Sequence, residues 1–527
     1  MRKILRSVVK KLQSIYLSPE EKMLEEREEI GRLKVAQELL RSEKASGPGI
    51  RPKGDDQLLQ LLSDDLEDVL QSYSQEVRKF ENIVEKVDLD NLDSSLSEDE
   101  KDNIRHAVRE YRQDSEIPQT VRELVDGETG LRSKWGEATE LEDVEEEFTD
   151  LVYALRDFSG QDYGEVLNIW EPNVEQEKID SLMAEVKSES RSILQDISNE
   201  EIEEVWNKTG AKVNESESLD EVTGSSAAIH EFLSNYMLSG NPMRMPVRIA
   251  ESGMEDGNPL MAPLQTTDQS FWAKSLDTTA HEFGHTFGRQ NLSEEHMYLP
   301  LGEPPSEAVD EGSARFYQNH IFRSREFLEV LSEGGKGRPQ GLLSNHGVPD
   351  FEAENLYGWF NAIEPENTRR VSADPITYPL HVAVRYELEK ELIESDKPVE
   401  ELVEDLHSKW EEKMQEYIGD HIGVEYDLDE SETILQDVHW GKGKFGYFPN
   451  YTLGDVMAAN WRLKMNDDLE KNVAEYANTA DLDPINNCIS ENIWQHGKAV
   501  WERSDYIDLE TDAYIEHLRS KASGLYK

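Results

Sequence analysis

The sequence predicts a mainly α-helical fold with a minor β-sheet, and three observations support this. Apolar residues recur at spacings of three and four along highly charged segments, which is the period of an amphipathic helix. Strand-like alternation is rare, and its best example is the stretch at 245–252. Hydrophobic residues make up 37% of the 527-residue chain, enough to fill a sizeable core and too many for a disordered chain.

Five segments in the N-terminal half have helical periodicity. Gly and Pro residues around 46–56 separate the first two of them, because these residues interrupt helices. The stretches at 209–224 and 252–268 are expected to be loops. The expected helices cover 19–44, 57–88, 98–124, 138–158 and 174–206.

The charge of the chain excludes some classes of function. With 55 basic and 111 acidic residues the net charge is −56, and such a surface repels nucleic acid and anionic membranes. Two interpretations remain, a surface for basic partners and a halophilic protein whose self-repulsion is screened by concentrated salt. Because the acidic residues are spread along nearly the whole chain, the pattern favours the halophilic interpretation.

Cysteine usage and hydropathy bear on the compartment. Cys488 is the only cysteine, so no disulfide can form within the chain and we expect a cytoplasmic protein. No stretch approaches the roughly 20 consecutive apolar residues that span a bilayer. The basic segment at 1–12 could lie on a membrane surface as an amphipathic helix, but pairing with the acidic surface of the chain itself is favoured.

The segment at 278–288, TTAHEFGHTFG, predicts a metal site. His281 and His285 are four residues apart, so a helix places both imidazoles on one face where they can bind one ion. Glu282 projects beside them and can take a proton from a metal-activated water. A solvated helix face with ordinary histidines is the structural alternative to this interpretation.

A third protein ligand is expected from a second helix. The H-x-x-G-x-x-H continuation that would supply a third histidine is absent, so a glutamate has to serve. The stretch at 306–322 predicts a helix that begins at Ser306. Glu307 and Glu311 are one turn apart on this helix, and from spacing alone either could reach the ion.

The run from His281 to Phe327 resembles the core of the carboxypeptidase Taq family of zinc carboxypeptidases. That family has H-E-x-G-H, then a P-L-G turn and a helix with H-E-S-Q-S-R, and this chain has Pro300-Leu301-Gly302 and Asp310-Glu311-Gly312-Ser313-Ala314-Arg315. The resemblance implies that Glu311 is the third ligand and that Glu307 is a solvated neighbour. It implies one Zn²⁺ per chain, with Co²⁺ as an alternative, and Asp310 could orient a ligand.

The resemblance continues beyond the metal site. Residues 368–392 are similar to the R-x-x-A-D motif of the family, and 434–454 are similar to its Q-D-x-H-W and G-Y-F-P-x-Y motifs. The whole resemblance covers residues from about 103 to 522. We therefore expect an N-terminal helical region over 1–102 and a catalytic body over 103–527. The resemblance also implies a large helical zincin with a long active-site groove, and a homodimer.

Three side chains in the second of these segments could donate to the oxyanion that forms during peptide hydrolysis. His439, Tyr447 and Tyr451 lie within 13 positions of one another. A packed aromatic turn is the structural alternative for the tyrosines. Asp437 next to His439 favours a functional role for the histidine.

An enzyme that removes C-terminal residues must also recognise a carboxylate, and a guanidinium can bind one through two hydrogen bonds. Arg370 is the first candidate. Arg248 is the second, in a stretch similar to the D-V-R-I-T motif of the family, although Pro246 and Ala250 replace its acid and its threonine. A structural ion pair is the alternative for both arginines.

These features together predict a zinc-dependent metallocarboxypeptidase that acts on peptides. An oligopeptidase that cuts internal bonds is the alternative enzyme. A catalytically inactive peptide-binding relative is a third interpretation, which the joint presence of His281, Glu282, His285 and Glu311 disfavours. Neither nucleic acid nor a membrane is expected as a partner.

Overall fold

The computed structural model describes most of the chain. The N-terminal segment 1–12 lies outside the described residues, as does all but the first residue of each expected break, at 46–56 and at 209–224. The described residues are 18–46, 66–84, 86–116, 119–126, 130–209, 247–250, 262–265, 272–293, 295–296, 298–333, 352–479 and 481–526.

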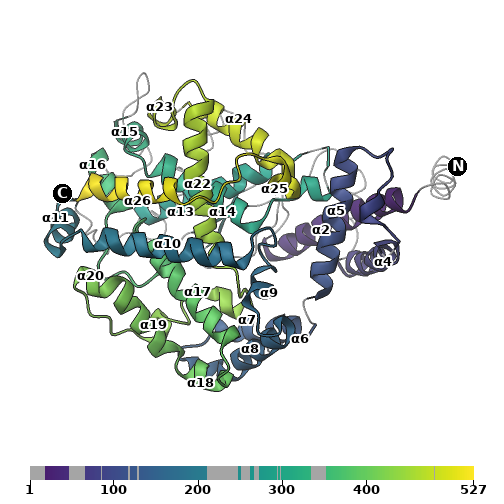
Figure 1. The fold of residues 1–527 in the computed structure, drawn as a ribbon, viewed down its shortest axis with the longest axis horizontal. Helices are drawn as coiled ribbons and strands as arrows, with labels where there is room; N and C mark the ends of the chain where they lie inside the picture. Colours follow the sequence, from purple (N-terminus) through teal and green to yellow (C-terminus); the bar gives the residue numbers. More distant parts are fainter. Residues whose placement is uncertain are drawn as a thin grey trace.

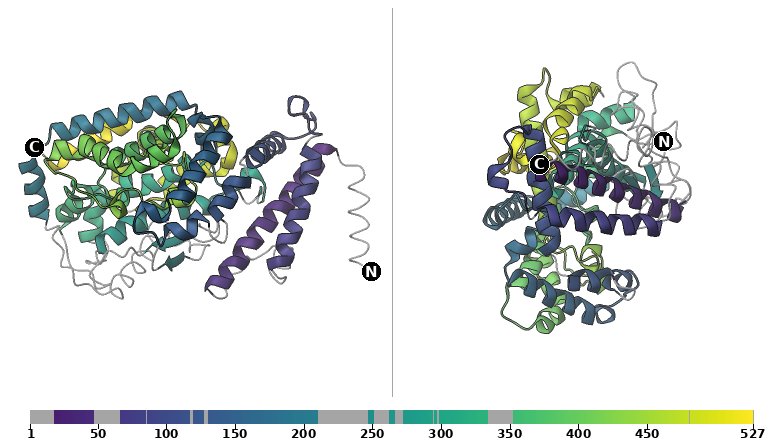
Figure 2. Two further views of the ribbon diagram at one scale, coloured as in Figure 1. Left: turned by 90° about the horizontal axis from the view of Figure 1, so that it is seen from below. Right: turned by 90° about the vertical axis from the view of Figure 1, so that its right-hand side faces the viewer.

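Three helices form an N-terminal unit that projects from one side of the larger body (Figure 1, Figure 2). They are α2 (Pro19–Ser46), α4 (Leu66–Val84) and α5 (Glu98–Glu116), with the short η1 (Leu89–Asn91) before α5. Their apolar faces form a small core of their own, in which Met23 and Phe80 meet Ile104. A domain boundary at 102 stays a prediction, and α5 runs through that position.

The N-terminal unit is attached to the body near the segment that joins the two helices of the predicted metal site. Arg27 is buried and pairs with Glu110 of α5 and with Glu303 of the body. The backbone N–H of Leu301 donates to Asn103 Oδ1 at 2.9 Å. A buried arginine that bridges two carboxylates fixes this junction more firmly than an exposed ion pair would.

The described part of the body is mainly helical, as the sequence predicts, and shares one large hydrophobic core. None of its described helices, nor those of the N-terminal unit, is long and apolar enough to cross a membrane. The first half contains α6 (Gln119–Asp126), α7 (Leu131–Trp135), η2 (Leu141–Asp143), α8 (Glu145–Ser159), α9 (Tyr163–Leu167), α10 (Gln176–Gln195), α11 (Asn199–Thr209), α13 (Trp272–Gln290), η3 (Pro300–Gly302), α14 (Glu307–Arg315), the π-helix η4 (Phe316–Phe322) and α15 (Arg325–Glu333).

The C-terminal half adds the helices that surround the second motif segment. It contains α16 (Ala353–Asn361), η6 (Arg370–Ser372), α17 (Tyr378–Glu394), α18 (Val399–Glu404), α19 (Leu406–Met414), η7 (Gln415–Gly419), α20 (Asp420–Ile422), η8 (Glu430–Glu432), α21 (Val438–Gly441), α22 (Pro449–Asp468), α23 (Val473–Thr479), α24 (Asp483–Asn492), η9 (Trp494–Ala499), α25 (Val500–Arg503) and α26 (Asp512–Leu525).

The expected helix at 174–206 is divided into α10 and α11. Ser198 and Glu201 make a reciprocal cap at the start of α11, in which each side chain accepts the backbone N–H of the other residue, at 2.9 and 3.3 Å. A capping box of this kind begins a new helix within a continuous apolar pattern. The expected helix at 98–124 likewise consists of α5 and α6, and the residues between them lie outside the described part.

Two short strands pair in parallel, with Val247 opposite Ala262. The first, β1 (Val247–Ala250), falls inside the strand expected at 245–252. The second, β2 (Ala262–Gln265), falls inside the stretch at 252–268, and the expectation of a loop there is wrong for these four residues. Pro263 lacks the backbone donor of a strand residue, so the local sequence contains little sign of this pairing.

Helix α14 lies between α13 and α22 in the middle of the body (Figure 1). Glycines allow the close approach on both sides. A Cβ on Gly284 of α13 would lie 2.5 Å from Ala314 Cα, and a Cβ on Gly454 of α22 would lie 2.8 Å from Gly312 N. Contacts this short leave no room for a side chain, so the three helices bring their polar residues close together.

Candidate active site

His281, His285 and Glu311 converge from α13 and α14. Their ligand atoms all lie within 4.8 Å of one another. The two Nε2 atoms are 3.3 Å apart, and His281 Nε2 is 3.6 Å from Glu311 Oε2. The Glu311 Oε2 atom is buried and has no hydrogen-bond partner among the described residues. Two imidazoles and one carboxylate in this arrangement fit a divalent ion and form a donor set that catalytic zinc uses.

Each histidine faces a different partner through its other ring nitrogen. His285 Nδ1 lies 3.0 Å from Asp310 Oδ1, and Asp310 Oδ2 accepts a hydrogen bond from Arg289 at 2.9 Å. His281 Nδ1 lies 3.2 Å from the amide oxygen of Gln318. Second contacts of this kind orient the imidazoles that bind a metal.

Gln318 is itself held in place. Its Nε2 donates to Asp277 at 2.7 Å, and its oxygen accepts from Arg315 at 3.1 Å. Arg323 donates to both oxygens of Asp277, at 2.6 and 2.5 Å. The π-helix η4 carries Gln318 directly after α14, and π-helical segments are frequent at functional sites.

Glu282 follows the first histidine on α13 and lies in the same electrostatic environment. Its side chain keeps some solvent exposure. Burial of the carboxylate raises the pKa of Glu282 to about 7, and the nearby Glu311 acts in the same direction. A carboxylate whose pKa lies near neutrality is suited to take and return a proton.

Tyr447 reaches the glutamates of α14. Its hydroxyl lies 3.1 Å from Glu307 Oε2 and 3.4 Å from Glu311 Oε1. Glu307 is half-buried, so the expectation that it is merely a solvated neighbour needs correction. The reason is a tertiary contact from Tyr447, in the segment just before α22, that the spacing within α14 could not reveal.

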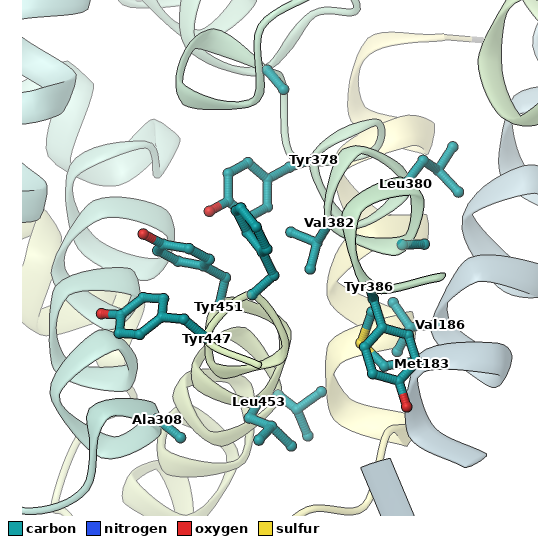
Figure 3. Close-up of a cluster of buried hydrophobic side chains, with 14 of the residues drawn as sticks. Met183, Val186, Ala308, Tyr378, Leu380, Val382, Tyr386, Tyr447, Tyr451 and Leu453 are labelled. Atoms are coloured by element: carbon teal, nitrogen blue, oxygen red, sulfur yellow. The ribbon is translucent and has the colours of Figure 1, made fainter. Parts of the chain in front are cut away.

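His439 and Tyr451 form a second pair, buried beside the first. His439 Nε2 lies 2.9 Å from the Tyr451 hydroxyl, and His439 Nδ1 is in close contact with Asp437 Oδ1. The hydroxyl groups of Tyr378, Tyr447 and Tyr451 all point to the same side, toward the helix that carries Ala308 (Figure 3). The polar ends of these aromatic residues therefore face α14.

Arg370 lies against these tyrosines, and only 5% of the residue is exposed. Its guanidinium stacks on the Tyr451 ring, with Cζ 4.0 Å from the ring centroid, and donates to the Tyr378 hydroxyl at 2.8 Å. Its Nε is 3.7 Å from Asp437, whereas Arg385 Nε contacts the same carboxylate oxygen at 2.6 Å. Arg385 is thus the closer of the two guanidinium groups to Asp437, and the Nε of Arg370 is left without an aligned hydrogen bond in the described residues.

Arg248 is not brought into this arrangement by the described residues. Its backbone lies in β1 opposite Pro263, and its side chain is outside the described part of the chain. Sequence reasoning did not single out Arg289, Gln318, Tyr378 or Arg385. A charged residue in the apolar stretch HVAVRYEL was a signal for Arg385, because an arginine inside a buried helix requires a partner.

A family model described as carboxypeptidase Taq metallopeptidase matches residues 264–522, which include every motif discussed above except that around Arg248. Residues 264–522 belong to the carboxypeptidase Taq family. Carboxypeptidase 1 of Bacillus subtilis is 28% identical over 455 residues, which cover 82% of this chain and 84% of that protein. Thermostable carboxypeptidase 1 of Thermus thermophilus is 36% identical over 201 residues, or 38% of this chain and 36% of that protein.

Solved structures show the same fold. Metallocarboxypeptidase 1 of Trypanosoma cruzi has a TM-score of 0.76 at 22% identity, covering 96% of this chain and 99% of that chain. The carboxypeptidase of Pyrococcus furiosus has a TM-score of 0.75 at 21% identity, with the same two shares. The predicted mainly helical fold is confirmed, and the long groove stays a prediction.

The carboxypeptidase Taq family places H-E-S where this chain has Asp310-Glu311-Gly312. Packing offers a physical reason for Gly312, because a Cβ at this position would lie 3.0 Å from the Trp461 ring and 3.4 Å from Gly454 O. A serine would require the indole to shift. Asp310 has two polar neighbours of its own, the imidazole of His285 and the guanidinium of Arg289.

Proposed function

We propose that this chain is a zinc-dependent carboxypeptidase that hydrolyses the last peptide bond of peptides with a free C-terminus. The observation that carries the proposal is the convergence of His281, His285 and Glu311 beside Glu282, with the buried guanidinium of Arg370 at the adjacent wall. The first group supplies hydrolytic chemistry, and the arginine supplies a means of recognising a carboxylate.

His281, His285 and Glu311 would hold the ion. A divalent ion bound there would act as a Lewis acid that activates water and polarises the peptide carbonyl. Zinc is proposed because two imidazoles and one carboxylate leave a coordination position open for water or substrate. Co²⁺ is the alternative ion, since imidazole and carboxylate ligands also suit it.

Glu282 is proposed as the general base. Its carboxylate would take a proton from the attacking water and give it to the leaving amine. The pKa of about 7, raised by burial, supports this role, because a base whose pKa is near the working pH serves both transfers.

Tyr447 and Tyr451, with His439 behind Tyr451, are proposed as donors to the oxyanion. The shared direction of the hydroxyl groups in Figure 3 supports this proposal. Tyr447 is bonded to Glu307 and Glu311, and Tyr451 to His439, so each hydroxyl would exchange a protein partner for the oxyanion. Donors aimed at a developing charge typically contribute about 10²–10³-fold in rate.

Arg370 is proposed as the group that binds the C-terminal carboxylate. Its partners supply little negative charge: a neutral hydroxyl at 2.8 Å and a carboxylate at 3.7 Å that Arg385 already engages. The positive charge is therefore available to a ligand. Arg248 remains the second candidate on the basis of resemblance alone.

Mass spectrometry of peptide digests tests the proposal. A peptide with a free C-terminus should lose single residues from that end, and the same peptide with a C-terminal amide should stay intact. Exhaustive metal removal should stop the reaction, and added zinc should restore it. Equal cleavage of both peptides at internal bonds would contradict the proposal and would show that the protein is an oligopeptidase. Binding without cleavage, with metal present, would point to an inactive peptide-binding relative.

A halophilic, cytoplasmic homodimer is proposed as the working form. The net charge of −56 supports the halophilic assignment. A lone cysteine, buried at 8% exposure, suits a reducing compartment, and the dimer rests on resemblance. Light scattering in molar salt tests the dimer, which a particle of 60.4 kDa would contradict.

A further inference from the structure

His285 and Arg289 lie one turn apart on α13, and both face a single carboxylate on α14. Asp310 is 5% exposed. Its Oδ1 lies 3.0 Å from His285 Nδ1, and its Oδ2 accepts from Arg289 Nη2 at 2.9 Å. Each carboxylate oxygen thus has its own cationic or proton-bearing neighbour, and Asp310 connects the imidazole to the guanidinium.

The two histidines of the site are supported differently. The partner of His281 is the neutral amide oxygen of Gln318 at 3.2 Å, whereas the partner of His285 is a carboxylate. His285 Nδ1 and Asp310 Oδ1 are both buried and make no aligned hydrogen bond to any described group. The two atoms lie 3.0 Å apart, and neither has another aligned partner in the described structure.

We propose that Asp310 and Arg289 are a positioning pair that orients His285 and sets how tightly the site binds its divalent ion. The inference rests on the proposed metal site. A carboxylate can only accept, so it favours the imidazole tautomer with hydrogen on Nδ1. The lone pair is then on Nε2, the atom that lies 3.3 Å from His281 Nε2 and faces the ligand cluster.

Arg289 has two effects in this pair. It offsets the charge of Asp310, which lies near two other carboxylates, Glu282 and Glu311. It also fixes the direction of the carboxylate by occupying Oδ2, which leaves Oδ1 for His285. Removal of the guanidinium would leave a buried carboxylate free to turn away from the imidazole.

The arrangement depends on the residue that distinguishes this chain from the motif of its family. Histidine is the family residue at position 310, and a neutral imidazole has a single acceptor nitrogen. It could not serve His285 and Arg289 at the same time. Aspartate has two oxygens, one for each neighbour, so Asp310 and Arg289 function as a unit in this chain.

Metal affinity tests the pair without reliance on turnover. Metal-free protein is titrated with zinc against a chromophoric chelator, and the dissociation constant is compared among Asp310→Asn, Asp310→His, Arg289→Met and Arg289→Lys. We expect Asp310→Asn and Asp310→His to weaken zinc binding about 10- to 100-fold. Arg289→Met should weaken it less, and Arg289→Lys should recover part of the loss because it keeps the charge.

The double variant Asp310→Asn with Arg289→Met makes the test specific. If Arg289 acts through Asp310, the double variant should bind zinc about as weakly as Asp310→Asn alone, because the two effects are not additive within one network. Asp374→Asn is the matched control. Asp374 is another buried aspartate, whose carboxylate accepts from Ile376 and Thr377 in the described structure, so its loss can lower the melting temperature but should leave the zinc constant unchanged.

Two results would overturn the pair while the metal site stands. One is a wild-type zinc constant in Asp310→Asn, and the other is an Arg289→Met effect that adds in full to that of Asp310→Asn. Failure of wild-type protein to bind any divalent ion would instead remove the proposed metal site itself. Circular dichroism of each metal-free variant distinguishes weak zinc binding from unfolding. If Arg289→Met does not fold, the zinc dissociation constant of Arg289→Lys still tests the role of Arg289.

Discussion

The imidazole Nε2 of His439 and the hydroxyl of Tyr451 lie 2.9 Å apart in the interior of the protein. The Asp437 carboxylate contacts the other nitrogen of the ring, so that nitrogen carries the hydrogen and Nε2 accepts from the tyrosine. Tyr451 is thus a donor whose hydrogen is already engaged. The Tyr451 hydroxyl can donate a hydrogen bond to a substrate oxyanion only if it gives up its bond to His439.

This bond makes His439 and Tyr451 a single functional unit. We expect Tyr451→Phe to lower kcat by about 10²–10³-fold through loss of an oxyanion donor. His439→Gln should lower kcat too, and the double variant should be little worse than Tyr451→Phe, because both changes remove one donor system. Steady-state kinetics on a free-acid peptide measures the three values.

Tyr447→Phe is the comparison for this unit. The Tyr447 hydroxyl contacts Glu307 and Glu311, whereas His439 Nε2 pairs with Tyr451, so the effect of Tyr447→Phe on kcat should add to that of His439→Gln. Full additivity between Tyr451→Phe and His439→Gln would contradict the view that they act together.

Glu282→Gln separates metal binding from proton transfer. The amide keeps the shape of the side chain but cannot accept a proton from water. We expect this variant to keep its zinc and to lose at least ~10²-fold in kcat. Metal analysis and kinetics on one preparation test both halves. Near-normal turnover with the metal bound would remove Glu282 from the mechanism.

Arg370 decides between cleavage at a free C-terminus and cleavage at internal bonds. Loss of a desolvated charge contact costs about 2–5 kcal/mol, or roughly 30- to several-thousand-fold in kcat/KM. Arg370→Met should show this loss on free-acid peptides and almost none on amidated ones. Arg370→Lys should recover only part of the activity, because an ammonium cannot bind a carboxylate through two parallel hydrogen bonds.

Arg248→Met is the matched comparison for the second candidate. If the loss on free-acid peptides appears in Arg248→Met and is absent from Arg370→Met, the carboxylate is bound by the β1 arginine. Equal cleavage of free-acid and amidated peptides by the wild-type enzyme would mean that neither arginine has this role.

The net charge of −56 predicts a strong response to salt. Repulsion among surface carboxylates opposes the folded state, and the screening length falls from about 10 Å at 0.1 M to about 3 Å at 1 M salt. The melting temperature should therefore rise steeply with potassium chloride up to the molar range. A flat response from dilute buffer upward would favour a dedicated surface for basic partners.

Local patterns in the sequence were sufficient to predict much of this structure. The helical period predicted the class of fold, and the pair of histidines four residues apart predicted the centre of the site because both lie on one helix. Spacing could not choose between Glu307 and Glu311, which share α14, and the choice needed the family resemblance. The structure brings Glu311 to both histidines and Glu307 to Tyr447.

Features that depend on tertiary pairing were not predicted. The sequence predicted a loop where β2 lies, because four residues that include a proline carry little strand pattern of their own. These residues form a strand because they pair with β1. Arg385 was overlooked although it is fully buried and bonds to Asp437, 52 residues away in the chain. Arg289 was overlooked for the same reason, since its partner lies on another helix.

Metal content tests the central claim most directly, namely that one ion is held by His281, His285 and Glu311. Elemental analysis of purified protein should find about one zinc per chain in the wild type. Glu311→Ala should have little or none, and Glu307→Ala should keep about one. A wild-type level in Glu311→Ala, with loss in Glu307→Ala, would contradict the assignment of the third ligand, and full peptidase activity in protein free of metal would contradict the metal site as a whole.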